Sequence, residues 1–346
     1  MIAKSAYRNF IFKQASGTSR GILKTKESWF LGLSENGELG IGECSVIEKL
    51  SPDLQYSISD RLQKLIKLIN TGQPIDLQNT IFESMPALRF CYEMALLDIE
   101  NKGQKLLFDT DFVNLQKGIP INGLVWMGAK SFMLDQIKTK ISEGYRCIKI
   151  KIAAIDFKEE CDLLHYIRRE FSADDIEIRV DANGGFNVDT AQEQLKRLSD
   201  FDIHSIEQPI APNQWNEMAK LCDEPYIDIA LDEELISLTH APTQKEMLDT
   251  IQPQYIILKP SLLGGFSAAE HWVKLAEGMG IAWWATSALE SNIGLNAIAQ
   301  WTAHMKTQQP QGLGTGMLYT NNIDSPLYID KGYLHYGNDH WGDIFV

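Results

Sequence analysis

Five charged residues recur along the middle of the chain at nearly regular spacing. They are Lys151, Asp181, Glu207, Asp232 and Lys259, and each stands at the end of a short apolar run. The intervals between them are 30, 26, 25 and 27 residues, about the length of one strand plus one helix. If the runs are neighbouring parallel strands, the five side chains gather at one end of the sheet. The order cation, anion, anion, anion, cation then indicates one site rather than five separate surface charges.

The three acidic residues predict a metal site. Carboxylates supply the hard oxygen ligands that Mg²⁺ takes, and three of them leave coordination positions for water and substrate. We therefore predict that Asp181, Glu207 and Asp232 are the ligands, with the adjacent Glu233 as the alternative to Asp232. The expected cofactor is Mg²⁺, for which Mn²⁺ could substitute, and no cofactor beyond the metal is expected.

The lysines are expected on both sides of this ion. Lys149 and Lys151 alternate along one run, which sends both to the same side, and Lys259 follows the acids on a later run. A lysine near another cation and partly removed from water releases its proton more readily, so Lys151 is predicted to act as a base. Each motif alone also has an ordinary explanation, because a K-x-K strand is often a half-solvated edge and an acid after a strand often caps a helix. The shared register is what favours a site.

A glycine run near the C-terminus is a second, weaker signal. Gly312, Gly314 and Gly316 form a G-x-G-x-G pattern that lacks the remaining features of a dinucleotide-binding loop. At the mouth of a barrel, such backbone is expected to donate N–H groups to a carboxylate or phosphate of the substrate. The predicted substrate-binding residues are Asn183, Ser287, Gly312 and Gly314.

The secondary-structure elements that must position these residues follow two different sequence patterns. The first hundred residues predict a β-hairpin, with runs at 22–33 and 39–43 joined by Asn36-Gly37, and then helices over 53–69 and 86–101. From residue 119 onward, short apolar runs alternate with helical patterns. The runs are 119–124, 147–152, 176–180, 204–206, 227–231, 255–258 and 281–285, and residues 312–317 are expected to form a shorter closing strand. Eight such units favour a closed barrel, although an open doubly wound sheet would also alternate.

Composition limits the class of protein. The 346 residues carry 32 Lys+Arg against 46 Asp+Glu, a net charge of −14 that repels nucleic acid and anionic membrane surfaces. The five cysteines are scattered without a C-x-x-C pair, which argues against a disulfide framework or a zinc ribbon. No signal-peptide core or long apolar segment is present. We expect a cytoplasmic protein with a small-molecule partner, no nucleic acid and no membrane; a homo-oligomer is left open.

Several motifs resemble a known family. They are Lys149-Ile150-Lys151, Asp181-Ala182-Asn183, Glu207-Gln208-Pro209, Leu231-Asp232-Glu233 and Lys259-Pro260-Ser261. In order and spacing they resemble the muconate-cycloisomerase-like branch of the enolase superfamily, over nearly the whole chain. The resemblance implies an α/β fold, a TIM-like modified (β/α)7β barrel with an N-terminal α+β capping domain. The implied domains are a capping domain at 1–105, completed by 320–346, and a barrel at 106–319.

Three further segments resemble the o-succinylbenzoate synthases of that branch, which are hydro-lyases of menaquinone biosynthesis. The segments are residues 42–45, 259–265 and 287–294. This resemblance implies a Mg²⁺-dependent syn-dehydration of the carboxylate 2-succinyl-6-hydroxy-2,4-cyclohexadiene-1-carboxylate to o-succinylbenzoate through an enediolate. It also implies that Lys151 is the acid/base, that Lys259 stabilises the anionic intermediate, and that Lys149 helps to neutralise the substrate carboxylate. The segments at 14–20 and 44–52 are expected to close over the substrate, as capping loops do.

Alternatives within and outside the branch differ in specific residues. Racemisation of N-succinylamino acids uses the same two lysines and stays open. Lys259 stands where mandelate-racemase-like enzymes carry a His-Asp base, and Gly314-Thr315-Gly316 stands where dipeptide epimerases carry Asp-x-Asp. A barrel that only binds a ligand would normally have lost one of the five charges, and all five are present.

Overall fold

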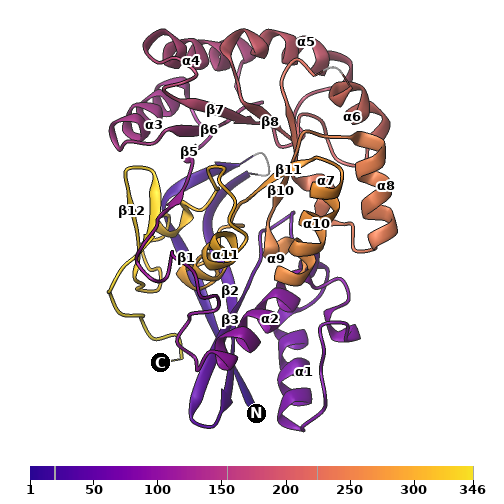
Figure 1. Cartoon of the computed structure of the whole chain (residues 1–346), viewed down its shortest axis with the longest axis vertical. Helices are drawn as coiled ribbons and strands as arrows, with labels where there is room; N and C mark the ends of the chain where they lie inside the picture. The colour runs from indigo at the N-terminus through magenta and orange to yellow at the C-terminus, as the bar shows by residue number, and fades with distance from the viewer. Residues whose placement is uncertain (19–20, 154, 224, 346) are drawn as a thin grey trace.

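The computed structural model describes residues 1–18, 21–153, 155–223 and 225–345. Figure 1 shows two parts: an antiparallel sheet with two helices near the N-terminus, and a curled parallel sheet surrounded by helices. The C-terminal segment returns alongside the first part. Of the segment 14–20 that was expected to cap the substrate, residues 19 and 20 lie outside the described residues.

The N-terminal sheet has the order β1-β2-β3, with bounds Ile2–Thr18, Gly21–Glu35 and Glu38–Ser45. Its second hairpin is the predicted one: Glu35 pairs with Glu38 across Asn36 and Gly37, which have φ of 52° and 86°. Two central residues with positive φ make the turn that matches the strand twist, and Asn-Gly favours that turn.

Two helices pack on this sheet. They are α1 (Ile58–Asn70) and α2 (Pro86–Glu100). The predicted start of the first helix at residue 53 is wrong. Residues Pro52–Gln55 form a separate 3₁₀ turn, η1, because the Asp53 carboxylate accepts hydrogen bonds from Ala87 N and Leu88 N at the start of α2. Strand β3 lies directly on α2, since a Cβ at Gly42 would stand 1.8 Å from the Cys91 carbonyl oxygen.

The second part is a parallel barrel. Its sheet has the order β11-β10-β9-β8-β7-β6-β5. The strands are β5 (Gly123–Val125), β6 (Cys147–Lys151), β7 (Glu177–Asp181), β8 (Ser205–Glu207), β9 (Ile229–Leu231), β10 (Tyr255–Leu258) and β11 (Ala282–Ala285). Parallel bridges from Gln311 to Ile121 and from Gly312 to Thr286 close the ring between its first and last strands. The closed barrel, rather than an open sheet, is therefore confirmed.

Helices connect these strands on the outside, with bounds α3 (Lys130–Ser142), α4 (Phe157–Glu170), α5 (Val188–Leu198), α6 (Trp215–Cys222), α7 (Glu233–Ile236), α8 (Ala241–Ile251), α9 (Pro260–Leu263), α10 (Phe266–Gly278) and α11 (Asn292–His304). Short 3₁₀ turns are η2 (Thr80–Phe82), η3 (Ser199–Phe201) and η4 (Thr315–Met317). Apolar residues of the strands and the helices that cover them form one large core, and a second core lies between the N-terminal sheet, α1 and α2.

Two predicted strands need correction. Residues 312–317 do not form a strand: backbone pairing stops after Gly312, and Thr315–Met317 turns as η4. Glycine at every second position weakens strand pairing, and only Gly312 joins the ring. The run 119–124 divides into β4 (Ile119–Pro120), which pairs with β13, and β5.

The C-terminal segment contacts both parts. Strands β12 (Leu327–Asp330) and β13 (Tyr333–Tyr336) form a small sheet with β4. Residues on either side of this sheet return to β1, where Lys13 N donates to Leu318 O at 2.8 Å and Arg8 donates to Asp343 O at 3.3 Å. These contacts are of the kind expected if residues 320–346 complete the N-terminal domain, and that division stays a prediction.

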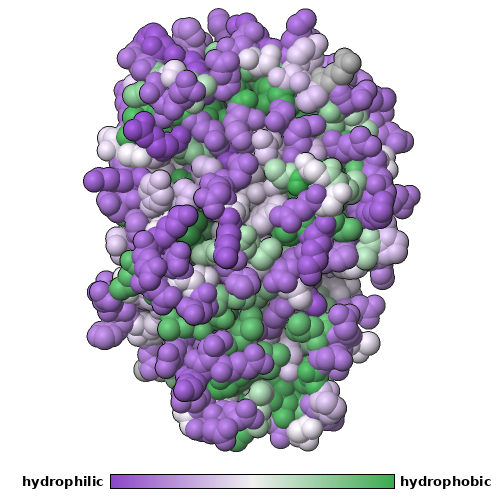
Figure 2. Space-filling view, viewed as in Figure 1, coloured by the Kyte–Doolittle hydropathy of each residue, from purple (hydrophilic) through white to green (hydrophobic). Residues whose placement is uncertain are grey.

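The face shown in Figure 2 is mostly hydrophilic. Hydrophobic residues gather toward its lower end, where Figure 1 places the N-terminal sheet and helices, and a few also lie near its upper end. Within the described residues, no helix has the length and apolar character needed to cross a bilayer.

Candidate active site

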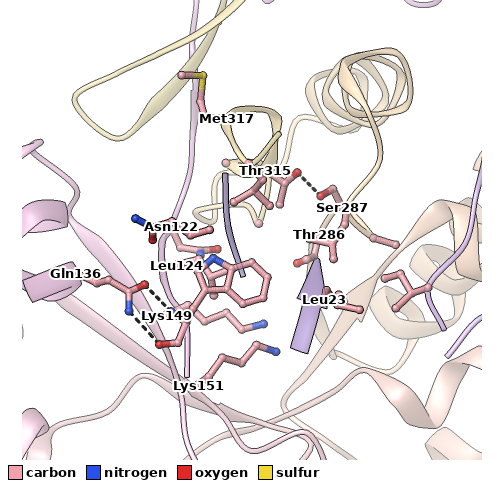
Figure 3. Close-up of a pocket in the computed structure, with 18 of the residues that line it drawn as sticks. Leu23, Asn122, Leu124, Gln136, Lys149, Lys151, Thr286, Ser287, Thr315 and Met317 are labelled. Atoms are coloured by element: carbon pink, nitrogen blue, oxygen red, sulfur yellow. Dashed lines mark hydrogen bonds between the residues drawn. The ribbon is translucent and has the colours of Figure 1, made fainter. Parts of the chain in front are cut away.

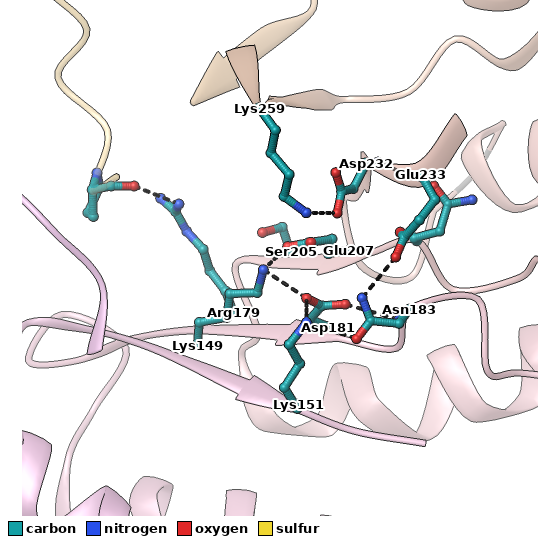
Figure 4. Close-up of polar contacts among 12 residues, drawn as sticks. Lys149, Lys151, Arg179, Asp181, Asn183, Ser205, Glu207, Asp232, Glu233 and Lys259 are labelled. Atoms are coloured by element: carbon teal, nitrogen blue, oxygen red, sulfur yellow. Dashed lines mark hydrogen bonds and ion pairs between the residues drawn. The ribbon is translucent and has the colours of Figure 1, made fainter. Parts of the chain in front are cut away.

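The strand register brings the predicted residues to one end of the barrel. Lys151 pairs with Asp181 across β6 and β7, and Asp181 pairs with Glu207 across β7 and β8. Glu207 pairs with Ala230, so Asp232 follows directly after the next strand, and Lys259 follows β10 in the same way. The five side chains lie together at the carboxyl ends of the strands (Figure 4), where barrels of this class place their active sites.

Two lysines of β6 approach the acids from one side. Lys149 Nζ lies 2.8 Å from Asp181 Oδ2 and also bonds Glu207 Oε2. Lys151 Nζ lies 2.5 Å from the same Asp181 oxygen and 2.8 Å from Asn183 Oδ1. The alternation predicted for this strand therefore holds, because both lysines reach one carboxylate.

Lys259 approaches from the opposite side. Figure 4 shows its side chain entering from above the acids while Lys151 enters from below, and its ammonium pairs with Asp232. The side chains of Lys151 and Lys259 are 14% and 12% exposed, so both reach the edge of the buried cluster. A molecule held at the acids would have an ammonium group on each face.

The charges within the cluster shift one another strongly. Burial lowers the pKa of Lys149, but the carboxylates of Asp181 and Glu207 outweigh burial and hold it above its usual range. Burial likewise opposes the charge of Lys259, and Asp232 raises the pKa of that lysine. Burial raises the pKa of Glu207 well above normal, and the neighbouring Asp181 charge raises it further. Three lysines, Lys149, Lys151 and Lys259, thus share the charge of the three carboxylates.

The acids have the chemistry of a divalent-ion site, although lysines now hold them. Among the described residues, no three His, Cys, Asp or Glu side chains are grouped as a ready ligand set. Glu207 Oε1 is nevertheless buried without a hydrogen-bond partner in the described part of the chain, next to two further carboxylates. An unpaired buried oxygen is costly, and a hard cation would satisfy it. Asp181, Glu207 and Asp232 therefore fit such an ion if their lysine partners move aside.

Neighbouring side chains hold the acids in place. Asn183, with φ of 46°, donates its backbone N–H to Asp181 Oδ1 at 3.0 Å and its amide to Glu233 Oε1 at 3.0 Å. Gln208, with φ of 40°, accepts from Asp232 N at 3.2 Å. Positive φ is uncommon for glutamine and less so for asparagine. Of the two candidates after β9, Asp232 faces Lys259 and Glu233 faces Asn183.

A cavity of about 850 Å³ opens over this cluster. Lys149, Lys151, Asn183 and Lys259 line it on the barrel side. The N-terminal part contributes Leu23 and residues 47–50, which belong to the predicted capping segment 44–52. Figure 3 shows both lysines of β6 pointing into the space, with Leu23 and Thr286 facing them.

The four predicted substrate-binding residues all line this cavity. Ser287 Oγ and Thr315 Oγ1 share a hydrogen bond of 2.5 Å at its upper wall (Figure 3), and Gly312 packs on Thr286. Asn122 and Thr315 also line the cavity, although they were not among the residues predicted from the sequence. Asn122 lies between β4 and β5, inside the run that was predicted as a single strand, and Thr315 lies within the glycine run.

The comparisons with known proteins agree with this geometry. The family model Enolase C-terminal domain-like matches residues 133–339. An o-succinylbenzoate synthase from Desulfotalea psychrophila is 49% identical and covers 94% of this chain and 96% of its own length. An N-succinylamino acid racemase from Amycolatopsis sp. is 26% identical, over 70% of this chain and 64% of the racemase.

A solved structure gives the same result. The crystal structure of MenC from Desulfotalea psychrophila superposes with a TM-score of 0.88 at 46% identity, covering 97% of this chain and 99% of that one. The barrel and the N-terminal domain are thus shared with a protein of high identity over nearly the full length of both chains. The chain belongs to the enolase superfamily.

Proposed function

We propose that the protein is a hydro-lyase that dehydrates 2-succinyl-6-hydroxy-2,4-cyclohexadiene-1-carboxylate to o-succinylbenzoate. The observation that carries the proposal is that Lys151 and Lys259 face each other across three buried carboxylates in a cavity roofed by the N-terminal domain. The 49% identical relative bears the name of this activity.

Lys151 is the proposed acid and base. Its neutral amine takes the proton from the ring carbon that bears the carboxylate, and the resulting ammonium returns that proton to the hydroxide leaving from the adjacent carbon on the same face. The products are the aromatic ring and one water molecule, so the lysine ends as it began. Asp181 and Asn183, which contact Nζ in the structure, orient the amine for both transfers.

Lys259 and Lys149 act by charge. Lys259, whose ammonium enters the site from the face opposite Lys151, is the proposed charge that stabilises the anion. Lys149 is buried beside Asp181 and Glu207, from where its charge offsets that of the substrate carboxylate.

Mg²⁺ is the proposed cofactor, with Asp181, Glu207 and Asp232 as ligands and Mn²⁺ as a substitute. When bound, the ion supplies positive charge that lowers the energy of the developing enediolate. The donor set and the unpaired Glu207 oxygen support this assignment.

Racemisation of N-succinylamino acids is the second candidate. It is favoured by the 26% identical relative of that name and by the placement of one lysine on each face, which two-sided proton transfer requires. The two candidates differ in the fate of the anion: it expels hydroxide in one case and is reprotonated from the other face in the second.

One experiment separates them. The purified protein with Mg²⁺ is given the cyclohexadiene acid, with aromatic absorbance as the readout, and separately an N-succinyl-L-amino acid, with optical rotation as the readout. We expect rapid formation of the aromatic product. Racemisation without aromatic product would replace the proposal with the second candidate, and neither reaction would reject both.

A further inference from the structure

Glu43 of β3 is buried where the N-terminal domain meets the barrel. Its side chain is fully shielded from solvent. Its carboxylate accepts from Ser28 Oγ within its own sheet at 2.8 Å, and from Ser291 N, Ser291 Oγ and Gly294 N at 2.9, 2.6 and 2.9 Å. The last three donors belong to the N-terminus of α11, where unpaired N–H groups and the helix dipole favour a negative charge. One domain therefore caps a helix of the other.

The segments on both sides of this contact line the cavity. Residues 47–50 follow β3 shortly after Glu43, and residues 286–289 directly precede the capped end of α11. The two segments also meet at one apolar cluster, because Ile47 and Leu50 pack against the group formed by Ile236, Leu262 and Ala288. Glu43 is thus anchored beside the place where the two cavity walls meet.

The same loop reaches the Lys259 side of the site. Glu290, just before Ser291, accepts a hydrogen bond from Ser261 Oγ, two residues after Lys259. Lys26 of β2 donates to Ser45 and lies close enough to Glu43 and Glu290 for their charges to act on it. Buried polar groups therefore lie on both sides of Ser291: Glu43 toward the N-terminal sheet, and Glu290 toward the segment that carries Lys259.

We propose that Glu43 is a positioning residue that fixes the cavity wall at 286–289 against the segment at 47–50 and so sets which carboxylate the cavity accepts. This inference rests on the proposed function and deepens it, because it assigns part of the substrate selection to a residue outside the cavity. Glu43 acts through α11 and the loop before it.

A matched control exists in the same interface. Glu93 of α2 caps α10 in the same manner, accepting from Phe266 N at 2.6 Å and Ser267 N at 3.0 Å. In the described part of the chain, Phe266 and Ser267 are not among the residues that line the cavity. Glu93→Gln therefore weakens an equivalent interdomain cap without touching a cavity wall.

The test compares Glu43→Gln with Glu93→Gln in the full-length, Mg²⁺-loaded protein. A glutamine amide presents an NH₂ group where the carboxylate accepted hydrogen bonds, so each variant loses part of its cap. We expect both variants to lower Tm. We expect Glu43→Gln alone to raise KM for the cyclohexadiene acid about tenfold, with kcat within about threefold of wild type. An unchanged KM in Glu43→Gln, or an equal rise in Glu93→Gln, would overturn the proposal.

Amide hydrogen exchange provides a readout without substrate. In Glu43→Gln we expect faster exchange both at 286–294 and at 46–51, whereas Glu93→Gln should leave both segments as in wild type. Faster exchange at 286–294 alone would mean that Glu43 only caps the helix, and would reject the proposal.

If Glu43→Gln does not fold, Ser291→Ala is the second variant. It removes one of the three interdomain hydrogen bonds, and we expect KM to rise about threefold. An unchanged KM in Ser291→Ala would reject the proposal. If the wild-type protein does not dehydrate the cyclohexadiene acid, the proposed function is rejected. The amide hydrogen exchange of the two variants then decides whether Glu43 positions the cavity wall.

Discussion

The mouth and the floor of the barrel both bury charge, but they satisfy it differently. At the floor, Arg179 is 2% exposed; its guanidinium donates to Glu177 at 2.7 Å, to Pro310 O at 2.8 Å and to Gln309 at 3.1 Å. It also lies 4.1 Å from the centre of the Trp284 ring. At the mouth, two residues further along the same strand, Asp181 shares two lysines and a neighbouring Glu207 oxygen has no hydrogen-bond partner among the described residues.

The difference shows which cluster is structural. A buried charge costs little only when all its hydrogen-bonding groups have partners. The floor meets that condition and needs nothing further. The mouth leaves acids that compete for the same lysines, which is the arrangement expected where an ion and a substrate carboxylate are to take over some of these contacts.

The largest expected effect is at the mouth. Lys151→Ala should lower kcat for the dehydration by about 10³-fold, because the proton has no other acceptor at that position. Circular dichroism and the Mg²⁺-induced rise in Tm should stay close to wild type. Lys245→Ala, which removes an exposed lysine of α8 paired with Asp249, is the control. Retention of more than a few per cent of activity in Lys151→Ala would remove this residue from its role.

The second largest expected effect is on the Mg²⁺ dependence of activity, which should change at the mouth and not at the floor. Asp181→Asn should raise the Mg²⁺ concentration for half-maximal activity at least about tenfold, because a charged ligand is lost. Glu177→Gln, the matched change at the floor, should lower Tm and leave that concentration as it is. Activity titrated against free Mg²⁺ provides the measurement, and an unchanged titration in Asp181→Asn would count against its assignment as a ligand.

Substitution at the floor should affect stability more than activity. Arg179→Met should lower the free energy of unfolding by about 2 kcal/mol, since it leaves the Pro310 carbonyl and Glu177 without their donor. The kcat of the folded variant should stay within about twofold of wild type. Urea denaturation measures the free energy of unfolding, and steady-state kinetics at urea concentrations below the unfolding transition measure kcat. A loss of kcat with unchanged stability would mean that the floor is part of the active site.

The smallest expected effect concerns the roof of the mouth. Ile47→Ala should raise KM about threefold by removing apolar contact from the cavity wall. Leu54→Ala, an exposed residue of η1, is the control. Equal KM values for wild type and Ile47→Ala would contradict the proposal that the 44–52 segment closes over the substrate.

The spacing of charges predicted the barrel and the gathering of its five residues because strand period and strand-end position are local properties of a sequence. It favoured Asp232 over the adjacent Glu233 by spacing alone, and it could not predict that Asp232 meets Lys259 while Glu233 meets Asn183. Asn122, Thr315 and the Glu43 cap escaped for a related reason: their roles depend on which loops of distant sequence come together, and no periodicity records that. The start of α1 was predicted too early because the Asp53 carboxylate binds the N-terminus of α2 instead of joining α1.

The exchange of lysine partners for an ion at the mouth can be observed directly. Crystals of the protein grown with Mn²⁺ and measured at an energy where manganese scatters anomalously should show one peak in contact with Asp181, Glu207 and Asp232, with Lys149 and Lys259 drawn away from their present carboxylate oxygens. A peak elsewhere, or full manganese occupancy of the crystal without contact to these three acids, would contradict the account.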